Sequence, residues 1–363
     1  MPNKLQEHFP MIRDRDEVRS LIQNSPSLSA VFHSWKYSDQ EHFLDYCTGV
    51  RGFKLLYDSF FKEIFNPDVS KERLEHLLSL ILNTQIRILK VLPNDAARIA
   101  AESSLLVMDI VVELEDGSIA NVEMQKIGYA FPGQRSACYS ADLLLRQYKW
   151  VRNQKGSSFN YKDIQKVYTI VFFEKSTSEF HQFPDTYIHR FIHRSDSGLR
   201  LNLLQGYVFI ALDIFKNTLD NKDILTIDEL DAWLTFLSVD DPDTILQLVQ
   251  AYPAFEHLYR EVYELCLNLE RMMEMFSKEL FELDKNTVQY MINEMQDIIN
   301  EQKDKITEQN NALVKKDNAL HEKDAALREK DAALHKKDSA LSEKDSLILS
   351  LQTKIELLKS RRL

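Results

Sequence analysis

Residues 105–126, LLVMDIVVELEDGSIANVEMQK, decide the fold of this 363-residue chain. Apolar and polar residues alternate on both sides of EDGS, which predicts two β-strands, and Asp116-Gly117 is typical of the turn that joins such strands. Each strand therefore has one apolar face. Matching the two apolar faces gathers the polar side chains on the opposite surface: Asp109, Glu113, Asn121, Glu123 and Gln125.

The register of this hairpin decides which carboxylates meet. Opposite residues in an antiparallel pair share a face, and their residue numbers have a constant sum. A two-residue turn at Asp116-Gly117 would place the carboxylates of the two strands on different faces. We therefore predict a three-residue loop or a bulge at Gly117, which pairs Asp109 with Gln125.

Further elements are expected on both sides of the hairpin. Helical spacing of apolar residues predicts helices over 53–65, 74–91 and 132–150, and apolar runs predict strands over 166–175, 186–193 and 206–214. This order predicts an α/β or α+β core with a mixed sheet. We divide the chain into an N-terminal helical extension (1–48), a core (49–225), a helical subdomain (226–290) and a C-terminal tail (291–363).

The distribution of glycine and proline supports this division. All 8 glycines lie at or before Gly206 and all 9 prolines at or before Pro253, so the last third is expected to be mostly helical. The sequence contains no G-x-G-x-x-G, no G-x-x-x-x-G-K-[ST] and no G-x-S-x-G. Dinucleotide-binding, P-loop and nucleophile-elbow enzymes are therefore excluded.

The tail repeats a seven-residue unit: KKDNALH, EKDAALR, EKDAALH, KKDSALS and EKDSLIL. One apolar position recurs from Ile292 through Leu320 to Ile355, but Lys and Asp fill the positions that would complete the seam until Leu351 and Leu358. The tail thus fits either a solvated single helix or a weak parallel coiled coil that forms a homodimer.

Charge and cysteine content narrow the class of protein. The formal net charge is −11; residues 301–363 carry +2 and the remainder −13, which argues against a general nucleic-acid binder. Three widely spaced cysteines fit neither a disulfide framework nor a zinc site. With no signal-peptide pattern and no apolar run long enough to span a bilayer, we expect a cytoplasmic protein without membrane contact.

The polar face of the hairpin suggests metal chemistry. Converging carboxylates suit Mg²⁺ or Mn²⁺, which prefer oxygen ligands, orient a water molecule and offset charge on a phosphate. The alternative is an ordinary solvated strand face.

Three motifs of this sequence are similar to those of a known protein family. Asp109 is followed after thirteen residues by Glu123-x-Gln125; the preceding helix holds Asp58-x-x-Phe61-Lys62-x-x-Phe65; and the following helix opens with FPGQR at 131–135 and contains Tyr139. The stretch resembles the PD-(D/E)XK nuclease family transposases, relatives of the Rpn recombination-promoting nucleases. The resemblance implies a restriction-endonuclease-like mixed sheet flanked by helices, and Mg²⁺-dependent hydrolysis of DNA phosphodiesters.

The resemblance also implies roles for single residues. Asp109 and Glu123 would be metal-binding carboxylates, with the Met124 carbonyl as a further ligand. Gln125 stands where the wider superfamily has lysine; an amide can hold the attacking water but supplies no positive charge. Lys62 is our candidate for the missing charge.

Three further residues have two interpretations each. Asp58 either pairs with Lys62 on the helix surface or borders the site as an extra acid. Arg135 and Tyr139 either contact DNA phosphate and support the site or are a surface arginine and a half-buried tyrosine.

Two functions remain open from the sequence. One is a Mg²⁺-dependent DNA endonuclease associated with recombination or mobile elements. The other is a weak or inactive nuclease fold that binds DNA or acts as a scaffold and self-associates through the tail.

Overall fold

The structure, a computed structural model, describes residues 2–56, 58–92, 109–127 and 132–360. The side chains of residues 58, 127, 282–298, 301 and 357–360 lie outside that description. So do residues 105–108 of the first predicted strand, Phe131 of the FPGQR motif and the side chains of Asp58, Ile292 and Leu358. The described chain forms two units, residues 1–291 and 292–363.

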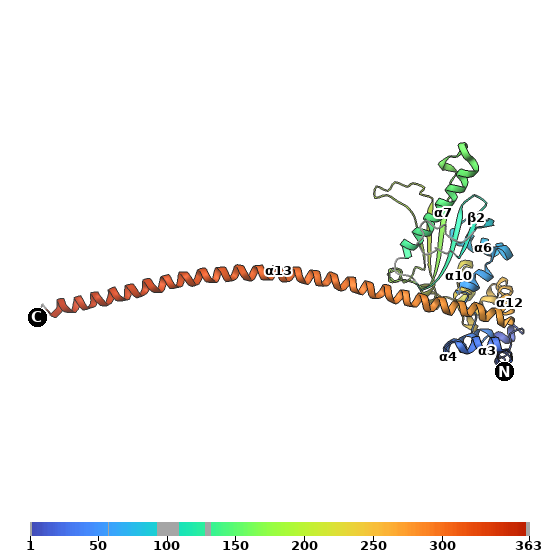
Figure 1. The fold of residues 1–363 in the computed structure, drawn as a ribbon, viewed down its shortest axis with the longest axis horizontal. Coiled ribbons are helices and arrows are strands. Elements are labelled where there is room, and N and C mark those ends of the chain that lie inside the picture. Colours follow the sequence, from blue (N-terminus) through green and yellow to red (C-terminus); the bar gives the residue numbers. More distant parts are fainter. Residues whose placement is uncertain (1, 57, 93–108, 128–131, 361–363) are drawn as a thin grey trace. The chain divides into compact units, whose positions relative to one another are not determined.

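Helices precede, cover and follow the strands of the first unit (Figure 1). The α-helices are α1 Lys4–His8, α2 Arg15–Asn24, α3 Pro26–Ser34, α4 Tyr37–Cys47, α5 Asp58–Ile64, α6 Pro67–Leu82, α7 Pro132–Lys155, α8 Ser178–His181, α9 Leu212–Leu219, α10 Glu229–Ser238, α11 Pro242–Ala251, α12 Ala254–Leu267 and α13 Leu269–Ser360. Short 3-10 turns occur at Gly156–Ser158, Tyr161–Asp163 and Ile224–Thr226.

The described strands form one mixed six-stranded sheet with the order β1-β2-β3-β4-β6-β5. The pairs β1–β2, β2–β3 and β5–β6 are antiparallel, and the central strands β3, β4 and β6 run parallel to one another. The strands are β1 Ile88–Val91, β2 Ile110–Leu114, β3 Ile119–Ile127, β4 Val167–Lys175, β5 Ile188–Phe191 and β6 Gln205–Ala211. The predicted mixed α/β architecture is therefore confirmed.

The two faces of the hairpin separate as the alternation predicts. Its apolar face joins the main hydrophobic core, together with residues of α5, α6 and α10. The hairpin residues of this face are Ile110, Val112, Leu114, Ala120, Val122 and Met124. The opposite face carries Val111 and Ile119, which pack against Tyr139 and Leu143 of α7. The polar residues of that face thus lie beneath α7.

One helix prediction is wrong. The apolar stretch 74–91 is not a single helix, because α6 ends at Leu82 and the chain then forms β1. Asn83 adopts the left-handed conformation (φ 54°) that ends the helix. Residues such as Ile86 and Ile88 continue the helical spacing of apolar residues, although they belong to a turn and a strand.

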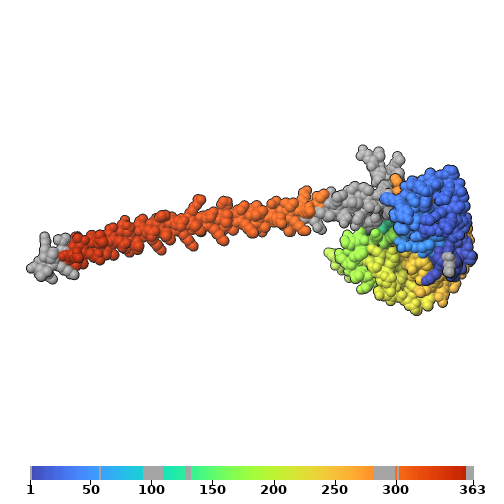
Figure 2. Space-filling view, turned by 90° about the horizontal axis from the view of Figure 1, so that it is seen from below, coloured from blue at the N-terminus to red at the C-terminus, as the bar shows by residue number. Residues whose placement is uncertain are grey.

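The N-terminal helices pack against the later helices α12 and α13 within the first unit. Trp35 lies edge-on against Phe276 of α13, with ring centroids 5.1 Å apart, and Arg13 donates to the Leu267 carbonyl of α12. Figure 2 shows their surface (blue) next to that of segments coloured yellow to orange. This contact with distant helices buries apolar side chains of the extension, such as Leu5 and Phe9.

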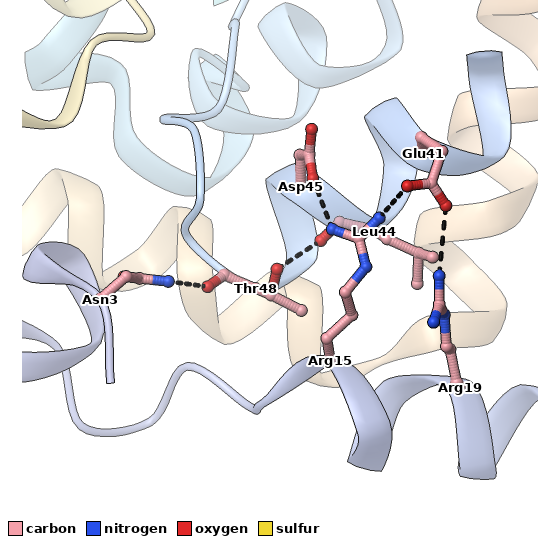
Figure 3. A network of polar contacts seen from close by, with 7 residues as sticks. All are labelled: Asn3, Arg15, Arg19, Glu41, Leu44, Asp45 and Thr48. Carbon is pink, nitrogen blue, oxygen red and sulfur yellow. Dashed lines mark hydrogen bonds and ion pairs between the residues drawn. The ribbon is translucent and has the colours of Figure 1, made fainter. Parts of the chain in front are cut away.

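Charged contacts join the N-terminal helices to one another (Figure 3). The Arg15 guanidinium contacts Asp45 at 2.6 Å and Glu41 at 2.5 Å, and Arg19 contacts Glu41 at 3.2 Å. Because one arginine bridges two carboxylates, α2 is held against α4 more firmly than by an isolated surface pair.

The second unit continues α13. Its recurring apolar positions are 51–62% exposed at Ile299, Ile306, Leu313, Leu320, Leu327, Leu334, Leu341, Ile348 and Ile355. The predicted long C-terminal helix is confirmed, and its pairing into a coiled coil stays a prediction. Among the described residues, no helix combines the length and low charge needed to cross a lipid bilayer.

Candidate active site

The hairpin turn fixes the relative positions of the two strands. The Leu114 amide donates to the Ser118 carbonyl at 2.8 Å, and the Gly117 amide donates to the Leu114 carbonyl at 2.9 Å. The loop thus has three residues, Glu115–Gly117, and Gly117 has a φ of +80°, which an L-residue rarely adopts. The prediction of a three-residue loop at Gly117 is confirmed.

The predicted pairing of opposite residues is wrong by two positions. Ile110 lies opposite Val122 and Val111 opposite Asn121, so the same register places Asp109 opposite Glu123 rather than Gln125. The reason is that the loop begins at Glu115, one residue earlier than assumed. The correction brings the two candidate metal ligands closer together than predicted.

Asp109 is held in place from two directions. Its Oδ2 accepts a hydrogen bond from the Met124 amide at 2.7 Å, and its Oδ1 lies 3.2 Å from the Lys62 ammonium of α5. The side chain is only 12% exposed. Backbone and cation together fix the orientation of this carboxylate.

Glu123 lies beside the backbone of Asp109, whose amide donates to the Glu123 Oε1 at 3.3 Å. Glu123 is 2% exposed, and burial raises its pKa from 4.5 to about 7. The neighbouring Asn121 amide and the positive charges of Arg135 and Lys62 oppose this rise in pKa. The site thus holds a carboxyl group that titrates near neutral pH.

Gln125 follows Glu123 on the same face of β3. It is 5% exposed, and its Oε1 has no hydrogen-bond partner within the part of the chain that the structure describes. A buried oxygen without a donor is costly unless a ligand or water satisfies it. Gln125 can therefore accept a hydrogen bond from a ligand or a water molecule.

Helix α7 covers the face of the sheet that carries the site. Arg135 Nε donates to the Tyr139 hydroxyl at 2.9 Å, and its guanidinium carbon lies 5.4 Å from the centre of the Tyr139 ring. Burial, with a contribution from Glu123, raises the pKa of Tyr139 to about 12, so its hydroxyl stays protonated at neutral pH. The expectation of a half-buried tyrosine is wrong, because Tyr139 is only 1% exposed between α7 and the sheet. The contact of Arg135 and Tyr139 with DNA stays a prediction.

Two charged residues of the hairpin are not part of this group. Glu113 shares the face of Asp109, but it pairs with Lys90 of β1 at 3.0 Å and lies four residues along the strand, roughly 13 Å away. Lys126 contacts Glu279 of α13 at 3.4 Å, and burial lowers the pKa of Lys126. Glu113 thus lies on the predicted face but away from Asp109 and Glu123, and Lys126 pairs with α13 instead of joining the two carboxylates.

The donor atoms fit a hard divalent cation. No group of three or more His, Cys, Asp or Glu side chains gathers in metal-binding geometry among the described residues. A cation at Asp109 and Glu123 would therefore have two carboxylate ligands and complete its shell with water and neutral oxygens, as Mg²⁺ does. The unsatisfied Gln125 oxygen and the cost of burying the charge of Glu123 both favour such a cation.

Comparison with known proteins agrees with this geometry. The model of the family described as PD-(D/E)XK nuclease family transposase matches residues 55–291, which is more than half of the chain. The chain therefore belongs to this family. No curated protein and no solved structure matches the chain. Membership of this family indicates nuclease activity and DNA binding as the general class of function.

Proposed function

We propose that this protein is a Mg²⁺-dependent DNA endonuclease that acts in recombination or on mobile elements. The observation that carries the proposal is the Asp109–Glu123 pair. Asp109 is oriented by the Met124 amide and by Lys62, and Glu123 lies against the Asp109 backbone. This juxtaposition, on a mixed sheet within the matched family region, supports a restriction-endonuclease-like core.

Asp109 and Glu123 would hold the metal, with the Met124 carbonyl as a further oxygen donor. The metal, when bound, would orient and acidify a water and offset negative charge on the phosphate. Holding two buried carboxylates together in the ionised state favours a cation, since their own repulsion would otherwise raise the pKa of one of them.

Lys62 supplies the positive charge that Gln125 lacks. Its ammonium lies 3.2 Å from Asp109, and its charge partly opposes the rise in the pKa of Glu123 that burial causes. We infer that Lys62 stabilises charge on the scissile phosphate, and that Gln125 holds the attacking water through its unsatisfied oxygen. Arg135, anchored to Tyr139, would contact a neighbouring phosphate, and Asp58 at the start of α5 would border the site.

The tail would make the enzyme a dimer. Its apolar positions are exposed along the whole described part of the second unit, which a parallel partner helix would cover. Two linked active sites would allow cleavage of both DNA strands.

A non-catalytic DNA-binding or scaffold protein is the second candidate. The specific observation in its favour is that a neutral amide, Gln125, occupies the position where the superfamily has lysine. Tight DNA binding without metal-dependent cleavage would favour this candidate.

An assay of supercoiled-plasmid nicking distinguishes the endonuclease from the non-catalytic DNA-binding or scaffold protein. The endonuclease proposal predicts open-circular and linear products with Mg²⁺, no products with EDTA, and loss of cleavage in Asp109→Ala. Cleavage that survives in Asp109→Ala would reject the assignment of the site.

A further inference from the structure

An aromatic groove lies on the same sheet face as the candidate active site. Its cavity of about 490 Å³ falls within the range of small-molecule sites. The groove lies between the first turn of α7, α8 and strands β5 and β6; its walls include Phe180, Phe183, His189, Phe191, Tyr207 and Phe209.

The groove and the carboxylates lie in one row across the sheet. Glu123 of β3 pairs with Val171 of β4, Val171 pairs with Phe209 of β6, and Phe209 pairs with His189 of β5. Three strand spacings of about 4.8 Å separate Glu123 from His189, or roughly 14 Å. An extended chain of a few nucleotides covers such a distance.

Two phenylalanines at the groove are exposed although they are large and apolar. Phe183 is 56% and Phe191 55% exposed, and each keeps one side free while packing edge-on against a ring behind it. The supporting rings lie at 5.7 Å (Phe183 to His189) and 5.3 Å (Phe191 to Phe209) between centroids. Rigidly supported, exposed rings are suited to stacking with a planar ligand.

The segment that forms this wall is basic, although the unit is acidic. Residues 192–206 contain Arg194, Arg200 and His193 against the single acid Asp196, whereas Arg190 faces the other side of the sheet and donates to the Ile81 carbonyl. The described lining of the groove itself contains one acid, Glu179. Residues 192–204 form a long irregular loop between β5 and β6 (Figure 1). Arginines interleaved with exposed aromatic residues are typical of surfaces that bind single-stranded nucleic acid.

We propose that this groove binds unpaired bases of the DNA substrate, which makes the protein selective for single-stranded or locally melted DNA. The inference deepens the proposed nuclease function, because the groove and Glu123 lie on the same face of the sheet, roughly 14 Å apart across three strand spacings. Bases would stack on Phe183 and Phe191, while Arg194 and Arg200 would contact the backbone. Stacking tolerates any base, so the groove would supply structural rather than sequence selectivity.

The test is a binding measurement that needs no cleavage. Fluorescence anisotropy of a labelled 20-nucleotide oligothymidine is measured with the full chain in EDTA, in parallel with a duplex of the same length. We expect tighter binding of the single strand. Phe183→Ala and Phe191→Ala should each weaken that binding at least about 5-fold, as loss of one stacked base implies.

Two variants control for indirect effects. Tyr37→Ala removes an exposed aromatic side chain (76% exposed) of α4, outside the groove, and should leave binding unchanged. Phe191→Trp retains a stacking surface and should restore binding, which a merely structural role of Phe191 would not predict.

The outcomes separate this inference from the nuclease proposal. Equal affinity of wild type, Phe183→Ala and Phe191→Ala for oligothymidine overturns the groove assignment, even if plasmid nicking depends on Asp109. Phenylalanine-dependent binding without any cleavage supports the groove and contradicts the endonuclease. If light scattering instead shows that Phe191→Ala halves the particle mass, the groove binds a second copy of this chain, and the inference is wrong.

Discussion

Glu123→Gln should stabilise the metal-free protein at alkaline pH. Burial raises the pKa of Glu123 from 4.5 to about 7, so the folded state binds this proton more tightly than the unfolded chain does. The stability contributed by the proton is complete below pH 4.5 and is lost as the pH rises through about 7. Each pKa unit corresponds to about 1.4 kcal/mol, so the loss amounts to about 3 kcal/mol.

Glutamine cannot ionise and therefore avoids this loss. We expect the free energies of unfolding of Glu123→Gln and wild type to be similar near pH 4.5, and the variant to be more stable by about 3 kcal/mol near pH 8.5. The same variant should lose cleavage, since it lacks a metal-binding carboxylate. Stability gained together with activity lost is typical of active-site residues.

Urea unfolding in EDTA, followed by tryptophan fluorescence from pH 4.5 to 8.5, measures this difference. The three tryptophans, Trp35, Trp150 and Trp233, all lie in the first unit, so the signal does not depend on the tail. Glu115→Gln is the matched control, because Glu115 is exposed in the same hairpin and should change stability by less than about 0.5 kcal/mol at every pH. A difference between Glu123→Gln and wild type that is independent of pH, or largest in acid, would refute the reasoning.

Three other predictions concern Lys62, the hairpin turn and the C-terminal tail. Lys62→Met should lower the cleavage rate about 100-fold, with partial rescue in Lys62→Arg, in single-turnover kinetics; an unchanged rate would remove Lys62 from the site. Gly117→Ala should destabilise the first unit by about 1–2 kcal/mol in the same urea assay, because φ is +80° and a Cβ would lie 3.1 Å from Gln165, whereas Gly117→Asn should cost less. Truncation after Lys305 should convert a dimer into a monomer in light scattering, and a truncated chain that still forms a dimer would show that the tail does not form the dimer.

Local features of the sequence predicted the hairpin and its faces. Alternation alone separates Val112 and Val122, which enter the main core, from Asn121 and Glu123 on the opposite face. The turn residue Gly117 was identified because few residues adopt a positive φ. The predicted partner of each hairpin residue was wrong by two positions. The reason is that a three-residue loop can begin at Glu115 or at Asp116, and the local sequence does not choose between them.

Contacts between distant segments were harder to predict. The Lys62–Asp109 contact joins α5 to the hairpin, and only the motif resemblance directed attention to Lys62. Strand β1 was missed because Ile86 and Ile88 continue the apolar spacing of α6. The aromatic groove was missed as well, because its walls come from four elements whose proximity depends on the strand order.

Nicking of supercoiled plasmid as a function of Mg²⁺ concentration tests the central claim most directly, with wild type, Asp109→Ala and Glu115→Gln measured in parallel. We predict Mg²⁺-dependent cleavage by wild type and Glu115→Gln and none by Asp109→Ala. Equal cleavage by all three proteins, or cleavage by wild type in EDTA, would contradict the assignment of Asp109 and Glu123 as the metal-binding pair of a nuclease.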